Sequence, residues 1–169
     1  NSVSTSYPDG SMESATYNPT GSVTSATNQR GQAVAYTYDS SGRLLTKTFA
    51  GGAQVAFVYD ARGRLASVTD TNGTTSFTHD ASDRVTQIAY PGGRFLTYTY
   101  DTAGRRIRME DQTGFRVNYS YDALSRLSSL TDGSGASVAT YTYDATGYLQ
   151  SKTNGNGSST TYEHDAAGQ

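Results

Sequence analysis

The stretch Tyr98-Thr99-Tyr100-Asp101-Thr102-Ala103-Gly104-Arg105 contains the unit from which the whole chain is built. Its pattern of aromatic, any residue, aromatic (or His), Asp occurs seven times, and the intervals between successive aspartates are 21, 20, 21, 21, 22 and 21 residues. A degraded eighth copy begins at Tyr17-Asn18, with Asn18 standing 21 residues before the first of these aspartates. A fixed period of this length predicts a tandem-repeat fold. The seven aspartates are Asp39, Asp60, Asp80, Asp101, Asp122, Asp144 and Asp165.

Each repeat contains two runs of alternating residues and two turns. In residues 53–73 the first run places Val55, Phe57 and Tyr59 on one face, as expected for a strand with a period of two. The turn Asp60-Ala61-Arg62-Gly63 has aspartate first and glycine last, which favours a type I turn closed by a left-handed glycine. The second run ends at Asn72-Gly73, a strong tight-turn pair. Each repeat is therefore predicted to be a β-hairpin.

The composition predicts an unusual core. Only 34% of the 169 residues are hydrophobic and cysteine and tryptophan are absent, but 14 tyrosines recur in register. We therefore predict an all-β protein in which residues 1–169 form a single array of about eight hairpins, cut within a repeat at both ends. The array makes one long, twisted or coiled antiparallel sheet, and its core is an aromatic layer repeated along that sheet.

Several function classes are disfavoured by the same numbers. The net charge is −2 and the basic residues are dispersed, so a nucleic-acid interface is not expected. No apolar run approaches the length of a membrane span. The lack of cysteine excludes disulfides and thiolate metal sites, and no cofactor or metal is predicted.

The recurring motif Tyr-Asp-x-x-Gly-Arg-Leu, present at residues 38–44 and 59–65, closely resembles the YD or RHS repeat. This repeat is found in bacterial RHS proteins and polymorphic toxins, in the C components of insecticidal toxin complexes, and in teneurins. The resemblance implies hairpins wound into a spiral, hollow β-shell. In toxin members the shell encloses a C-terminal toxic domain, and in teneurins the analogous barrel belongs to an adhesion receptor.

For this chain the resemblance implies a non-enzymatic scaffold in a secreted or cell-surface bacterial protein. Its partners would be the rest of a larger RHS-type chain or the cargo enclosed by it. The self-cleaving aspartates of the family are not recognised in the 169 residues, so no catalytic residue is carried over.

The equivalent positions of the repeats form what we call the column. Its aspartates are predicted to bond to the amides of their own turns, its arginines to pair with aspartates, and its tyrosines to stack in cross-strand pairs. The column consists of Tyr38, Asp39, Gly42, Arg43, Tyr59, Asp60, Gly63, Arg64, His79, Asp80, Arg84, Tyr100, Asp101, Gly104, Arg105, Tyr121, Asp122, Arg126, Tyr143, Asp144, Gly147, His164, Asp165 and Gly168.

Five positions depart from the pattern. His79 and His164 replace the tyrosine, Asp83 and Ser125 replace the glycine, and Tyr148 replaces the arginine. Aspartate tolerates the left-handed conformation, whereas serine does so less readily, so a different turn is expected at Ser125. The histidines are interpreted as ring substitutes, because no nucleophile recurs beside both.

Two alternatives to the scaffold remain open. One is an adhesion module that binds carbohydrate or protein through its tyrosines or its variable hairpin loops. The other is a self-associating array, a homo-oligomer formed through unpaired sheet edges or through the aromatic face.

Overall fold

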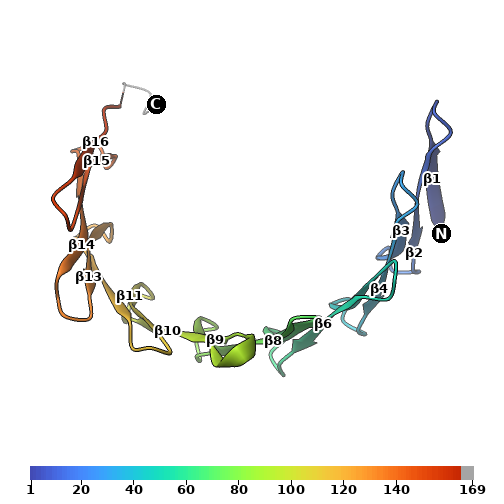
Figure 1. Cartoon of the computed structure of the whole chain (residues 1–169), viewed down its shortest axis with the longest axis horizontal. Coiled ribbons are helices and arrows are strands. Elements are labelled where there is room, and N and C mark those ends of the chain that lie inside the picture. Colours follow the sequence, from blue (N-terminus) through green and yellow to red (C-terminus); the bar gives the residue numbers. More distant parts are fainter. Residues whose placement is uncertain (165–169) are drawn as a thin grey trace. The chain divides into compact units, whose positions relative to one another are not determined.

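The computed structural model describes residues 1–164, and the strands in this part of the chain number sixteen, accompanied by one short 3-10 turn, η1 (Pro91–Gly93). The strands form an antiparallel sheet whose order follows the sequence, from β1 to β16 (Figure 1). The all-β, hairpin-repeat fold predicted from the sequence is thereby confirmed. In chain order the strands are β1 (Ser2–Ser6), β2 (Met12–Tyr17), β3 (Val23–Thr27), β4 (Ala33–Tyr38), β5 (Leu44–Phe49), β6 (Gln54–Tyr59), β7 (Leu65–Asp70), β8 (Gly73–His79), β9 (Val85–Ala89), β10 (Phe95–Tyr100), β11 (Arg106–Asp111), β12 (Arg116–Tyr121), β13 (Leu127–Asp132), β14 (Ser137–Tyr143), β15 (Leu149–Asn154) and β16 (Ser159–Thr161).

The chain divides into two compact units. The first comprises Asn1–Asp83 with Ala89–Gly92, and the second comprises Arg84–Ile88 with the residues from Gly93 onwards. Strands β1 to β8 belong to the first unit and β10 to β16 to the second. Within each of these two runs, every strand pairs antiparallel with the strands before and after it in the sequence. That the whole array behaves as one domain stays a prediction.

The hairpin of β4 and β5 shows how a repeat is built. Tyr36 pairs with Lys47 and Tyr38 with Leu44, and the register shifts by one residue between Thr37 and Tyr38. In the connecting turn the Gly42 amide donates to the Asp39 carbonyl at 3.0 Å, and the Asp39 amide donates to the Arg43 carbonyl at 2.9 Å. Gly42 has a φ of 78°, so the turn is the predicted type I turn with a left-handed glycine and a bulge.

Strand alternation separates two kinds of side chain. One face, here called the aromatic face, carries the column tyrosines together with the residues that pair with them, such as Leu44 opposite Tyr38. The opposite face, here called the hydroxyl face, is rich in serine and threonine. On it Thr37 and Thr46 are joined by a hydrogen bond of 2.7 Å between their hydroxyls. The column tyrosines therefore recur on one face, and charged residues such as Lys47 interrupt that face at some of the paired positions.

The aromatic layer is only half-buried. Among residues 1–164, Ala139 is the one buried apolar residue, with 3% of its surface exposed. Tyr38, Tyr59, Tyr100 and their equivalents are partly covered by their neighbours in the sheet. A sheet that is not packed against a second layer leaves one face of each ring in contact with solvent. The aromatic face of residues 1–164 is therefore partly open to solvent.

Candidate functional site: the column

The column aspartates close their own turns. Asp39 accepts hydrogen bonds from the Ser41 and Arg43 amides at 2.9 Å through Oδ1, and from Arg43 Nε at 2.7 Å through Oδ2. Equivalent bonds to the arginine amide and to its Nε are made by Asp60, Asp101 and Asp122. These donors favour the ionised carboxylate. The Arg64 side chain, followed by the turn amides, lowers the pKa of Asp60 from 3.8 to about 2.

The column arginines connect each repeat to the next. Arg43, already bound to Asp39, places its guanidinium 4.8 Å from the centre of the Tyr59 ring in the following hairpin. The guanidinium groups of Arg84, Arg105 and Arg126 lie 4.7, 4.8 and 4.4 Å from the next column tyrosine. The predicted stacking of ring on ring is therefore wrong for these four tyrosines, because a guanidinium occupies the ring face. Such cation–π contacts stabilise a partly exposed pair by about 0.5–1 kcal/mol. The four tyrosines are Tyr59, Tyr100, Tyr121 and Tyr143.

The tyrosine hydroxyls make a second connection between repeats. The hydroxyl of Tyr59 donates to the carbonyl of Leu44 at 3.0 Å, and that of Tyr100 donates to the carbonyl of Val85 at 2.7 Å. The acceptor is the residue that follows the column arginine of the preceding repeat, except for Tyr38, whose acceptor Val23 follows Ser22. The sequence did not reveal this hydrogen bond, because a period identifies equivalent residues but not the carbonyl that each ring reaches. The remaining pairs are Tyr38 with Val23, Tyr121 with Arg106 and Tyr143 with Leu127, at 2.8, 2.8 and 2.9 Å.

The column glycines serve the arginines as well as the turns. Gly63 has a φ of 83°, and a Cβ at this position would lie 2.9 Å from Nη1 of Arg43 in the preceding repeat. At Gly104 and Gly147 the corresponding distances are 3.7 and 3.8 Å. At Gly42 a Cβ would meet nothing within 4 Å, so only its φ requires glycine.

The two replaced glycines keep the same turn. Ser125 has a φ of 65°, its amide donates to the Asp122 carbonyl at 3.0 Å, and the turn closes as in the other repeats. The expectation of a different turn at Ser125 is therefore wrong. Its hydroxyl accepts a hydrogen bond of 3.0 Å from Arg105, which offsets the cost of the left-handed backbone. Asp83, with a φ of 64°, likewise accepts from Arg64 at 2.8 Å.

The repeats that carry a histidine in place of the column tyrosine differ in their contacts. Arg64 donates to the Asp80 carbonyl at 2.9 Å beside His79, and Ser82 caps the Asp80 carboxylate through its amide at 2.9 Å. At the position of the missing arginine, the Tyr148 ring stacks on His164 with centroids 5.0 Å apart and an interplanar angle of 23°. Asp144 then relies on the Thr146 hydroxyl, the main cause of its lowered pKa. Asp165 and Gly168 lie outside the described residues.

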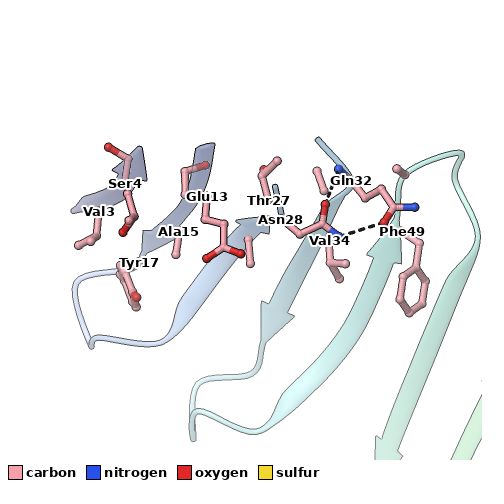
Figure 2. Close-up of a pocket in the computed structure, with 15 residues that line it drawn as sticks. Val3, Ser4, Glu13, Ala15, Tyr17, Thr27, Asn28, Gln32, Val34 and Phe49 are labelled. Carbon is pink, nitrogen blue, oxygen red and sulfur yellow. Dashed lines mark hydrogen bonds between the residues drawn. The ribbon is translucent and has the colours of Figure 1, made fainter. Parts of the chain in front are cut away.

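A groove of about 670 Å³ lies on the aromatic face of the first unit (Figure 2). Ala15, which lines the groove, occupies a position where other repeats have an aromatic residue. Val34 and Phe49 line the groove, and Asn28 donates to Gln32 at 2.9 Å beside it. The lining is mixed, with apolar side chains such as Val34 and Phe49 and polar ones such as Glu13 and Gln32.

The described residues offer no metal centre, because no three acidic, histidine or cysteine side chains within 1–164 lie close enough to hold an ion. Helices long and apolar enough to cross a membrane are likewise not found in that part of the chain.

The sequence matches the family model described as Teneurin YD-shell over residues 5–110 and 94–169. A comparison with curated proteins gives no match. Among solved structures, the chain is similar to that of TcdB2-TccC3-Cdc42, with 20% identity, a TM-score of 0.71, and coverage of 85% of this chain and 9% of the other. The structure of TcdB2-TccC3 without its hypervariable C-terminal region is 18% identical with a TM-score of 0.75, and the match covers 92% of this chain and 10% of the other. A Tc holotoxin pore from Photorhabdus luminescens is 20% identical with a TM-score of 0.75, and the match covers 92% of this chain and 10% of the other. At these identities the likeness concerns the fold, and the chain spans about a tenth of the length of the chains it matches.

Proposed function

Because the chain belongs to the Teneurin YD-shell family, we propose that it is a section of the wall of a hollow β-shell and acts as a non-enzymatic scaffold. The observation that carries this proposal is the column itself. Its aspartates, arginines and tyrosines are engaged with one another and with the backbone, as in Asp39, Arg43 and Tyr59. Side chains used in this way stabilise a wall and leave few groups available for chemistry.

The half-buried aromatic face supports an enclosing role. A single sheet with one apolar face needs cover, and a closed wall with that face inside supplies it. We propose that the wall encloses or presents another domain of a larger chain, such as a toxin domain. In this proposal the protein is secreted or exposed on a bacterial cell surface.

The mass of the native polypeptide tests the proposal. An antibody against residues 1–164 would identify the native chain in its source, and its mass would be read by denaturing electrophoresis. We expect a mass far above 18.0 kDa, together with a second domain that resists protease until the shell is opened. A native mass of 18.0 kDa would contradict the wall proposal.

A binding role is favoured by one observation, the groove beside Ala15 and Phe49 in the first unit (Figure 2). Binding of sugars by ring stacking is disfavoured at Tyr59 and Tyr100, whose ring faces already carry a guanidinium. A glycan array separates the two functions, since a wall segment should bind no sugar. Self-association through strand β1, which within residues 1–164 pairs with β2 alone, would appear in light scattering as oligomers that grow with concentration.

A further inference from the structure

Arg106 breaks the pattern of the repeats in the second unit. It follows the column arginine directly, at a position where the other repeats have leucine or valine. These equivalents are Val23, Leu44, Leu65, Val85, Leu127 and Leu149. A charged residue therefore stands at a position that is otherwise apolar, on the face that carries the tyrosines.

Two tyrosine rings lie close to the Arg106 side chain. Arg106 pairs with Tyr100 across the hairpin, which places it on the aromatic face. Its guanidinium lies 4.5 Å from the centre of the Tyr119 ring and 5.6 Å from that of Tyr98. The residue is exposed, and its guanidinium forms no hydrogen bond or ion pair with residues 1–164.

The free edge of this guanidinium determines what it can bind. The guanidinium contacts two tyrosine rings, and the planar fork of its N–H groups suits the two oxygens of a carboxylate. The acids on this face, Asp111 and Asp132, already accept hydrogen bonds within their own turns. These carboxylates therefore bind their own turns and leave the Arg106 guanidinium without a carboxylate partner among residues 1–164.

We propose that Arg106, held between Tyr98 and Tyr119, is a docking point for a carboxylate of an acidic polypeptide segment on the aromatic face of β10–β12. This inference rests on the proposed function, in which that face meets a second polypeptide. A polypeptide fits better than a polysaccharide for two reasons. The neighbouring Tyr121 has its ring covered by Arg105 and its hydroxyl bonded to a carbonyl, and the apolar Met109 and Val117 lie beside the site.

The test measures the binding of a fluorescein-labelled peptide of alternating glutamate and leucine to the folded chain by fluorescence anisotropy. The matched peptide has glutamine in place of glutamate. We expect Arg106→Leu, which restores the residue type of the other repeats, to weaken binding of the glutamate peptide about tenfold. Arg106→Lys keeps the charge but not the planar fork, so it should fall between Arg106→Leu and the native chain.

Arg108→Leu is the control. Arg108 is exposed on the same strand, but it pairs with Thr99 on the hydroxyl face, so its loss should change binding less than about twofold. Equal binding by the Arg106→Leu and native chains would overturn the inference, as would equal affinity for the glutamine peptide. Tighter, Arg106-dependent binding of an oligouronate or an oligonucleotide would overturn the choice of a polypeptide. Failure here with a native mass far above 18.0 kDa would remove the docking point and leave the wall proposal intact.

Discussion

The guanidinium of Arg126 lies 4.4 Å from the centre of the Tyr143 ring, one repeat further along the chain. The same side chain donates through Nε to Asp122 in its own turn at 2.7 Å. A single arginine thus joins the turn of one hairpin to the ring of the next. In a repeat array, stability depends on such contacts between neighbours, because no central core spans the structure.

The tyrosine hydroxyl is expected to stabilise the array independently of the ring. Tyr100→Phe removes the hydrogen bond to the Val85 carbonyl and should lower the free energy of unfolding by about 1 kcal/mol. Urea unfolding followed by circular dichroism measures the loss. Tyr141→Phe is the control, because the Tyr141 hydroxyl makes no hydrogen bond with residues 1–164. Equal effects of the two substitutions would show that the hydroxyl bond contributes nothing.

Two column glycines should differ in their tolerance of alanine. Gly42→Ala should cost about 1 kcal/mol, the penalty of a left-handed backbone alone. Gly63→Ala should cost about 2 kcal/mol, since its Cβ would also displace Arg43 from the Tyr59 ring. Thermal unfolding of both variants measures the difference. A Gly42→Ala variant as unstable as Gly63→Ala would mean that the space for Arg43 is unimportant.

Restoring tyrosine at position 79, where the column has His79, should stabilise the array. His79→Tyr supplies a hydroxyl that can reach the Leu65 carbonyl, as Tyr59 reaches the Leu44 carbonyl, and should raise stability by about 0.5–1 kcal/mol. His79→Phe restores the ring without the hydroxyl and should gain less. Calorimetry of the three chains measures both steps. A lower melting temperature for His79→Tyr than for the native chain would refute the equivalence of the two positions.

The stability of the folded chain should fall in acid, because the column aspartates have lowered pKa values. The pKa of Asp60 is about 2 in the folded chain against an ordinary value of 3.8, and hydrogen bonds lower the pKa of Asp39, Asp101 and Asp122 in the same direction. Below pH 3.8 these aspartates are protonated in the unfolded chain but still ionised in the folded chain, so acid favours unfolding. The melting temperature should therefore decline as the pH falls from about 4 to about 2.

Asp60→Asn provides the control for this decline. It removes one of the titrating carboxylates, so the variant should melt lower at pH 7 and lose less on acidification. Melting curves at constant ionic strength measure both quantities. A native melting temperature that rises between pH 4 and pH 2 would contradict the assignment of these carboxylates.

The sequence predicted the hairpins well because turn chemistry is local. Asp60 and Gly63 specify their turn from four consecutive residues, and alternation assigns Tyr59 to a face without knowledge of its neighbours. Contacts between repeats were harder to predict from the sequence. The sequence could not show that Arg43 covers the ring of Tyr59, or that Arg105 supports Ser125 in a left-handed turn, because both depend on how far one hairpin is displaced from the next.

Electron cryo-microscopy of the native protein, purified from its source, tests the wall proposal most directly. We expect residues 1–164 to form part of a closed shell, with Tyr98, Tyr119 and the other rings of the aromatic face directed into the interior. Density for a second polypeptide should fill that interior. An aromatic face directed outward to solvent, or a native protein with no enclosed space, would contradict the account.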